Sequence, residues 1–159
     1  MSNFNNSKKI GKKGESATIN YYTCQGLNVI DVSENKDFQK MDIDLIVDDE
    51  YIEVKTQSSI ANNNTITLEL EVNYDDFLIN QGWFNTTEAN KLVFYDKNSN
   101  TAYEIDTKEL RDIYDKYKND VSIYYFDEDY KTSKLAFMDI DFVKSKSQTL
   151  NVLDYNLIV

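Results

Sequence analysis

Two alternating segments on either side of an acidic turn constrain this chain more than any other feature. Asp42–Val47 and Tyr51–Thr56 each alternate polar and apolar residues over most of their length, and Asp48-Asp49-Glu50 separates them. Alternation with a period of two is typical of β-strands, and a short polar connection between two strands is typical of a hairpin. The sequence therefore predicts an antiparallel hairpin over residues 42–56.

The register of this hairpin determines which side chains share a face. A turn symmetric about the Asp48–Asp49 bond pairs Asp44 with Glu53 and Asp42 with Lys55. Because side chains alternate along a strand, these four polar side chains then share one face, and a slip of one residue would separate the aspartates from the glutamate. The opposite face is expected to carry apolar residues into the core, namely Ile43, Leu45, Ile52 and Val54.

The chemistry of this polar face indicates a metal site. Two neighbouring carboxylates repel each other, and each raises the pKa of the other unless a cation lies between them. Mg²⁺ takes oxygen ligands, commonly one or two protein carboxylates together with a substrate phosphate. A lysine beside them can orient a metal-bound water or neutralise charge that develops on phosphorus. The face therefore predicts a site for Mg²⁺, for which Mn²⁺ can substitute.

The absence of histidine excludes most competing chemistries. The 159 residues contain no His and a single Cys24, which excludes His-dependent nucleophilic sites, His-ligated zinc sites and an internal disulfide. A single cysteine suits a reducing compartment. No apolar run approaches the ~20 residues that span a bilayer. We therefore expect a cytoplasmic protein that does not associate with a membrane.

Charge is distributed unevenly along the chain. The first 14 residues carry +4, whereas the whole chain carries −11, so the other residues carry −15. An acidic body is a poor surface for nucleic acid and suits a basic protein partner. The basic start is either a solvated segment or a phosphate contact beside a site. Its charge comes from four lysines, Lys8, Lys9, Lys12 and Lys13.

The remaining pattern predicts an α/β (α+β) domain. Gly14–Gln25 is expected as a helix ended by Gly26, and Thr107–Tyr117 as a helix that Thr107 caps. Further strands are expected at Leu27–Val32, Thr65–Leu70, Lys91–Tyr95, Ala102–Ile105, Val121–Phe126 and Leu135–Phe137, with a last one within Leu150–Val159. Loops are expected at Ser33–Lys40 and Ser58–Asn64, and helical or turn segments at Asp75–Asn80 and Thr86–Asn90. No linker composition divides residues 1–159, so we expect one domain.

These residues resemble a known family. Glu15 on the opening helix, then Asp44, then Glu53-Val54-Lys55 are similar to the motif of the PD-(D/E)XK nuclease superfamily. The resemblance covers roughly residues 10–95, and the segment from Gly82 to Ala89 is similar to one in phage-encoded members. It implies a restriction-endonuclease-like core in α-β-β-β-α-β order, a central mixed sheet flanked by helices. Residues 96–159 would add strands and a helix to the same domain.

The resemblance also implies a role for each site residue. Asp44 and Glu53 would be metal ligands, joined by the backbone carbonyl of Val54. Lys55 would be the catalytic lysine. Two further residues would take part in catalysis, Glu15 as the helix acid that completes or supports the site and Gln57 as an additional polar group.

The sequence departs from the family pattern in two ways. Met41 or Ile43 stands where the family name places proline, and Asp42 is an alternative to Asp44 as the metal ligand. We prefer Asp44, because it leads directly into the apolar Leu45–Val47 and pairs across the predicted hairpin from the glutamate of the motif.

Three interpretations of the polar face stay open at this point. The resemblance implies a Mg²⁺-dependent endonuclease that hydrolyses DNA, structure-specific or resolvase-like, and it is compatible with a homodimer. The same fold could instead serve without catalysis as an acidic protein-binding module, such as an inhibitor, immunity or anti-defence protein, and the net charge of −11 suits that function. In the third interpretation, Asp44, Glu53 and Lys55 form a cross-strand ion pair on an exposed sheet face.

Overall fold

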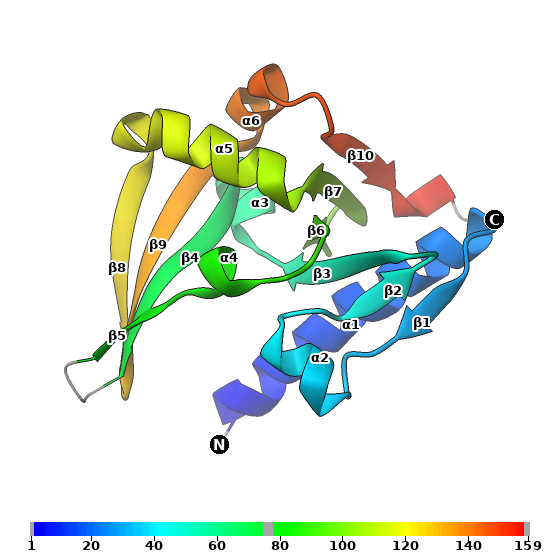
Figure 1. Cartoon of the computed structure of the whole chain (residues 1–159), viewed down its shortest axis with the longest axis horizontal. Helices are drawn as coiled ribbons and strands as arrows, with labels where there is room; N and C mark the ends of the chain where they lie inside the picture. Colours follow the sequence, from blue (N-terminus) through cyan, green and yellow to red (C-terminus); the bar gives the residue numbers. More distant parts are fainter. Residues whose placement is uncertain (1, 75–77, 158–159) are drawn as a thin grey trace.

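The computed structural model describes residues 2–74 and 78–157, which form two β-sheets with helices packed against them (Figure 1). In chain order the elements are α1 Ser2–Cys24, β1 Val29–Asp31, α2 Lys36–Lys40, β2 Leu45–Val47, β3 Glu50–Thr56, α3 Ser59–Asn63, β4 Thr65–Tyr74, β5 Leu78–Gln81, α4 Trp83–Thr86, β6 Lys91–Asp96, β7 Thr101–Asp106, α5 Thr107–Tyr117, β8 Ser122–Glu128, β9 Lys131–Asp139, α6 Ile140–Lys146 and β10 Asn151–Asp154. Short 3₁₀ turns follow α5 and β10.

The first sheet has the strand order β1-β2-β3-β6-β7-β10 and is mixed. Its first three strands are antiparallel, β6 runs parallel to β3, and β7 and β10 return antiparallel. Helix α1 packs along β1, β2 and β3 (Figure 1). The structure therefore confirms the expected central mixed sheet flanked by helices. The two acidic positions fall on its second and third strands, with Asp44 directly before β2 and Glu53 on β3.

The predicted hairpin register is confirmed. Leu45 pairs with Ile52, and Val47 pairs with Glu50, as predicted. The ladder pairs stop at Leu45, so Asp44 is not a ladder partner of Glu53, and its side chain is instead bonded to the N–H of Val54, the residue after Glu53. The regular ladder does not reach Asp42, whose left-handed φ of 51° bends the chain there, so the predicted pairing of Asp42 with Lys55 is wrong. The four residues expected in the core are all buried, with exposed fractions of 7% or less: Ile43, Leu45, Ile52 and Val54.

The second sheet has the order β5-β4-β9-β8 and is antiparallel throughout. The strand expected at Thr65–Leu70 belongs to this second sheet, as part of β4. The free edge of β3 is instead occupied by β6, which runs parallel to it. A parallel crossover needs a dozen or more residues, and here the crossover from β3 to β6 contains β4 and β5 as well as two short helices.

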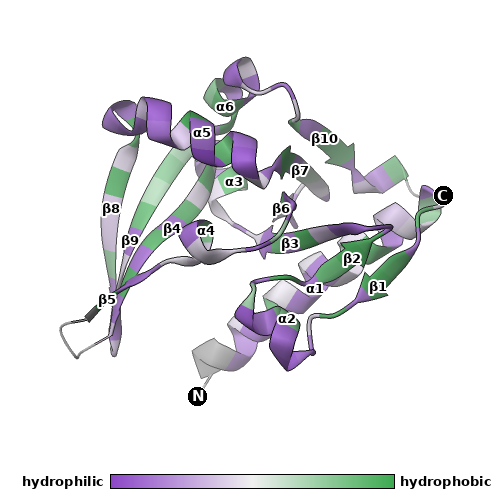
Figure 2. Ribbon diagram, viewed as in Figure 1, coloured by the Kyte–Doolittle hydropathy of each residue, from purple (hydrophilic) through white to green (hydrophobic). Residues whose placement is uncertain are grey.

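The two sheets share apolar packing. One face of β4 is buried through Ile66, Leu68 and Leu70, in the same cluster as Leu92 of β6 and Leu110 of α5. Figure 2 shows hydrophobic residues gathered on the strands and hydrophilic residues on the turns and much of α5. Strands from the N-terminal and C-terminal halves of the chain thus contribute to one cluster.

Helix α1 begins earlier than predicted and ends as predicted. It starts at Ser2 instead of Gly14, because the polar residues before Gly14 have no apolar face that periodicity could detect. Gly26 has a φ of 81°, and the N–H of Leu27 donates to the carbonyl of Tyr22, which is the hydrogen bond of a Schellman C-cap.

The short helices were missed or misplaced by the sequence patterns. Segments expected as loops contain α2 and α3, and α6 was not predicted. Such helices depend on local caps and tertiary packing, as at α2, where the Asn35 side chain accepts from the N–H of Asp37. Helix α5 has the predicted bounds, but its N-cap is Asp106 and not Thr107.

Two expectations of turn or helix in residues 75–90 were also wrong in part. Residues 78–81 form strand β5, and 75–77 lie outside the described residues. Thr86 ends the single-turn helix α4, and the chain beyond it to Asn90 is irregular. No helix in the described part of the chain is long and apolar enough to cross a membrane.

Candidate active site

Three contacts fix α1 on the first sheet and thereby position Glu15. The backbone of Gly14 lies so close to β3 that a Cβ atom there would stand 2.0 Å from Thr56 Oγ1. Any side chain at Gly14 would therefore lift the helix away from the sheet. The other two contacts are buried hydrogen bonds, from the Tyr22 hydroxyl to Glu104 and between the hydroxyls of Thr18 and Tyr155 at 2.8 Å.

Asp44 is held by the backbone of β3. Its Oδ2 accepts a hydrogen bond of 2.9 Å from the N–H of Val54, and its own N–H donates to the carbonyl of Ile52 at 2.9 Å. These bonds direct the carboxylate across the opening between β2 and β3. Asp44 therefore has a fixed position beside Glu53.

Asp42 is held by the segment after α4. Thr86 Oγ1 donates to Asp42 Oδ2 at 3.0 Å, and Thr87 Oγ1 donates to the Asp42 carbonyl at 2.9 Å. The guanidinium of Arg111 in turn donates to the carbonyl of Thr87 at 2.8 Å. The Thr86-Thr87 pair thus supports the chain where it enters β2, and one oxygen of the Asp42 carboxylate is already bonded.

Glu53 and Lys55 form an ion pair, with only 5% of the glutamate side chain and 26% of the lysine side chain exposed. The lysine ammonium also lies 4.7 Å from the centroid of the Trp83 ring. This cation–π contact was not anticipated from the sequence, since no spacing connects Trp83 of α4 with the lysine. The third interpretation, an ion pair on an exposed sheet face, does not describe the burial of Glu53.

Two open hollows meet at the acids. The first, about 290 Å³, is lined by Lys8 and Lys12 among others, and the second, about 470 Å³, by Lys55 and Lys97 among others. Both hollows are lined by the same three acids, Glu15, Asp44 and Glu53. The acidic centre is therefore reachable from solvent on two sides.

The surroundings of the three acids disfavour their charged forms. Burial raises the pKa of Glu53 to about 8. The nearby charge of Lys55 acts to lower this pKa, and that of Asp44 acts to raise it. Burial also raises the pKa of Asp44, although the Val54 N–H lowers it, and burial and Asp44 together raise the pKa of Glu15. Burial alone would lower the pKa of Lys55, but Glu53 and Asp44 outweigh it and raise that pKa, so the lysine stays protonated.

The donor set fits a small oxygen-seeking cation held by two carboxylates. Among the described residues, no group of three or more Asp, Glu, Cys or His side chains forms a metal cage. Asp44 and Glu53 are a neighbouring pair, which is the number of protein carboxylates that Mg²⁺ commonly uses. Glu15 Oε2 is buried and accepts no hydrogen bond from the described residues, although Lys12 Nζ lies 3.6 Å away. Glu15 therefore lines both hollows with one buried oxygen that accepts no hydrogen bond from the described residues.

Gln57 joins the two sheets. Its Nε2 donates to the carbonyl of Thr67 at 2.6 Å, and its Oε1 accepts from the N–H of Thr67 at 2.8 Å. The side chain lines the second hollow, but both ends of its amide are bonded to β4. We therefore describe it as a positioning residue at the end of β3.

Among the lysines that line the hollows outside the motif, Lys8 and Lys12 were named from the sequence only as part of the basic start, and Lys97 was not predicted to lie at the site. Lys12 Nζ donates to Ser33 Oγ and Glu34 Oε1, both at 3.2 Å, which ties α1 to the loop after β1. Lys97 reaches the second hollow from the turn between β6 and β7. No periodicity connects these positions. The basic composition of the first 14 residues was the one available signal, and it pointed to the side of the site where Lys12 lies.

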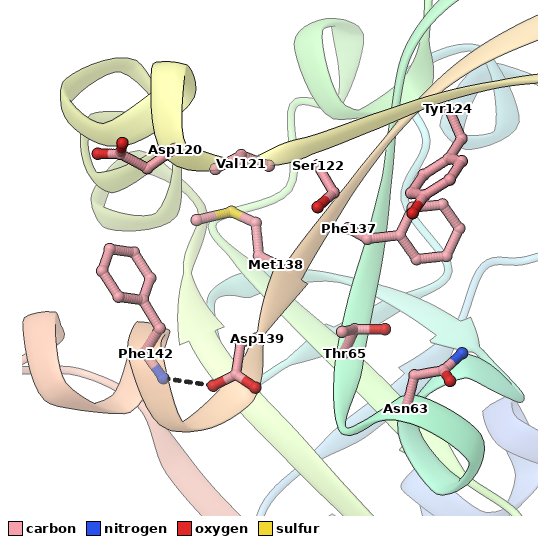
Figure 3. Close-up of a pocket in the computed structure, with 10 residues that line it drawn as sticks. All are labelled: Asn63, Thr65, Asp120, Val121, Ser122, Tyr124, Phe137, Met138, Asp139 and Phe142. Carbon is pink, nitrogen blue, oxygen red and sulfur yellow. Dashed lines mark hydrogen bonds between the residues drawn. The ribbon is translucent and has the colours of Figure 1, made fainter.

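A larger hollow of about 720 Å³ lies between β8, β9 and α6 (Figure 3). Its lining is mainly apolar, and the Asp139 carboxylate on its rim caps α6 by accepting from the N–H of Phe142 at 2.8 Å (Figure 3). It shares no described lining residue with the two hollows at the acids. The acids Asp44 and Glu53 therefore lie outside this larger hollow.

The comparisons with known proteins assign no family to this chain. No protein-family model matches it, and none of the curated proteins matches it. Among solved structures, the chain is similar to a bacterial homing endonuclease, I-Ssp6803I, with 14% sequence identity over 64% of this chain and 69% of that chain, at a TM-score of 0.49. A likeness of this size assigns neither family nor activity, so membership of the PD-(D/E)XK superfamily stays a prediction.

Proposed function

We propose that this protein is a Mg²⁺-dependent endonuclease of the PD-(D/E)XK type that hydrolyses DNA phosphodiester bonds. The observation that carries this proposal is the meeting of half-buried Asp44 and buried Glu53, beside a protonated Lys55, at two open hollows. Burying acids in this way lowers the stability of the fold. Such groups are therefore found mainly where a function uses them. A divalent cation and a phosphate would relieve the electrostatic strain on all three groups.

The proposed ligands are Asp44 and Glu53, with the backbone carbonyl of Val54 as a further oxygen and Asp42 as the alternative carboxylate. Val54 lines the same hollow as the two acids. When bound, Mg²⁺ or Mn²⁺ would polarise the phosphate and lower the pKa of a water.

Lys55 has a distinct task in this scheme. Because its pKa is raised, it acts as a hydrogen-bond donor and positive charge, not as a general base. It would donate to the phosphoryl oxygens, where negative charge grows in the transition state. Glu15 Oε2, free of hydrogen bonds from the described residues, would accept one from the attacking water and orient it.

A second candidate function is an acidic module that binds a basic protein. The net charge of −11 favours it, because like charge repels DNA and attracts a basic surface. In this case the hollows would need no metal, and substitutions at Glu53 would leave partner binding intact unless they touch the interface.

The deciding experiment is a cleavage assay on plasmid, linear and branched DNA with Mg²⁺ or Mn²⁺. We expect Glu53→Gln and Lys55→Ala to lose about 100-fold or more of the activity, consistent with removal of one transition-state stabilising group. The matched controls are Glu71→Gln and Lys134→Ala, which break a 3.3 Å ion pair that lines neither hollow. Cleavage that survives both site substitutions would reject the site, and no cleavage together with no metal binding by calorimetry would favour the binding module.

A further inference from the structure

The four lysines of α1 do not face the same way. Lys8 and Lys12 line the first hollow, and they lie on the same face of the helix as Glu15. Lys9 and Lys13 line neither hollow. Neighbouring residues on an α-helix are separated by about 100°. Lys9 and Lys13 are therefore turned away from the acids.

One lysine on each side of the acids has no acidic partner. Lys8 at the first hollow and Lys97 at the second form no ion pair with the described residues. By contrast, Lys12 and Lys55, which also line the hollows, are paired with Glu34 and Glu53. In a body as acidic as this one, unpaired cations that flank an open site are the places where a polyanion is attracted.

Gly11 follows Lys8 on α1 by three residues, lines the same hollow as Lys97, and has no packing reason to be glycine. It lines the second hollow in the middle of α1, and a Cβ atom there would meet nothing within 4 Å. At Gly14 the close sheet explains the missing side chain, but at Gly11 the space is open. A glycine inside a helix weakens it relative to alanine. An approach of a ligand to the helix backbone accounts for a bare surface at this position.

We infer that a nucleic-acid strand crosses α1 over Gly11, with one phosphate bound by Lys8 and another, on the other side of the scissile phosphate, by Lys97. The inference rests on the proposed function and names the substrate path of that site. From Lys8 to Glu15 the helix rises about 10 Å. Lys8 would therefore bind a phosphate near the scissile one and not the scissile phosphate itself.

The first test measures DNA affinity by fluorescence anisotropy with Ca²⁺ in place of Mg²⁺. We expect Lys8→Glu and Lys97→Glu to weaken binding about tenfold and each to reduce the salt slope by about one, as loss of a phosphate contact does. The controls Lys9→Glu and Lys13→Glu change the net charge equally and should weaken binding less than about threefold. Equal effects of Lys8→Glu and Lys9→Glu would overturn the path.

The second test locates each contact on the DNA. Single neutral methylphosphonates are placed on either side of the cut, and cleavage is measured with wild type, Lys8→Gln and Lys97→Gln. Once a lysine is removed, neutralising the phosphate that it contacts should have no further effect on cleavage, because the losses of two partners of one contact are not additive. The Lys8→Gln variant should therefore be insensitive to a methylphosphonate on one side of the cut, and Lys97→Gln to one on the other side. Variants that respond alike would overturn the inference.

A third variant tests the crossing point. Gly11→Leu should weaken DNA binding while the melting temperature stays at or above that of wild type, because leucine favours a helix more than glycine does. Unchanged affinity would show that the strand does not pass over Gly11. If wild type cleaves DNA and the lysine variants behave like their controls, the path alone fails, whereas a wild type that neither binds nor cleaves DNA removes the proposed function as well.

Discussion

Lys55 Nζ lies 4.7 Å from the centroid of the Trp83 ring while it forms an ion pair with Glu53. The π-face of an indole attracts a cation and also keeps water from one side of it. The lysine is therefore held by two groups from different elements, the acid on its own strand β3 and the aromatic ring of α4. Its position depends on the packing of α4 against the sheet as much as on the motif itself.

Replacing Trp83 by leucine removes the π-face but keeps an apolar side chain. We expect nuclease turnover to fall about three- to tenfold, since the contact is worth about 1 kcal/mol, and KM for DNA to stay near that of wild type. Trp83→Phe retains an aromatic face and should recover most of the turnover. Steady-state kinetics at a temperature where all three proteins are folded gives the comparison, and equal turnover of both variants would contradict a role for the ring.

The pKa of Glu53 predicts how the metal-free protein responds to pH. The pKa is about 8 in the folded state and about 4.3 in an unfolded chain. Between these values the folded state binds a proton that the unfolded state has released, so stability falls as pH rises through this window. We expect thermal melts in EDTA to show that the stabilisation of the folded protein by the Glu53 proton decreases from pH 5 to pH 8. Glu53→Gln should make the melting temperature depend less on pH over this range. An identical pH dependence in wild type and variant would contradict the raised pKa.

The response to metal should run in the opposite direction. Binding requires deprotonated carboxylates, so the rise in melting temperature on adding Mg²⁺ should grow as pH increases toward 8. With a dissociation constant of about 3 mM, 5 mM Mg²⁺ would add only about 0.6 kcal/mol, and Mn²⁺ should add more. At pH 8, Glu53→Gln should raise the stability of the metal-free protein and abolish the metal-dependent shift, whereas the control Glu71→Gln should keep it. A wild-type melt indifferent to both metals at 10 mM would count against the nuclease.

The two glycines of α1 should respond in opposite ways to alanine. A Cβ at Gly14 would stand 2.0 Å from Thr56 Oγ1 and 3.3 Å from the ring of Tyr95, so Gly14→Ala must displace the helix or the strand. We expect a loss of about 1–3 kcal/mol. Gly11→Ala meets open space and should gain about 0.5–1 kcal/mol from helix propensity. Urea unfolding of both variants gives the change in the free energy of unfolding at each site. A loss of stability in both variants would contradict the packing described for α1.

The parts of the fold that the sequence predicted well are those that local patterns determine. The alternation around residues 42–56 predicted the hairpin register, and the apolar stripe of Thr107–Tyr117 predicted the bounds of α5. The second sheet could not be predicted in this way. Its strands β4 and β9 are about 65 residues apart in the chain, and the alternation of polar and apolar residues in either strand does not indicate which other strand it pairs with.

The residues of the candidate site likewise fall into those that local sequence patterns place and those that tertiary contacts place. Glu53 and Lys55 follow from the hairpin register, and Asp44 enters it one residue before the first ladder pair, so the sequence placed these three residues close together. The bond from the Val54 N–H to the Asp44 carboxylate, which fixes that side chain, was not predicted. The position of Glu15 depends on how closely α1 approaches β3, which the close contact at Gly14 and two buried hydrogen bonds of α1 determine. The roles of Gln57 and Trp83 depend on contacts with β4 and β3 that no spacing reports. The left-handed backbone of Asp42, which removes it from the ladder, likewise follows from its tertiary bonds to the segment after α4.

The pairing of β4 with β9 also determines how this chain can be divided. The two strands pair from Thr65 with Asp139 to Tyr74 with Lys131. A fragment that ends after β6 would contain every residue of the nuclease motif, yet it would leave one edge of β4 unpaired, and an open apolar edge is a template for aggregation. The motif and the strands that support it are interleaved, so truncation to the motif region should yield an insoluble fragment. A split form of this protein would instead need both pieces, cut in the turn at Lys97 and co-expressed, so that the second restores the edge that the first lacks.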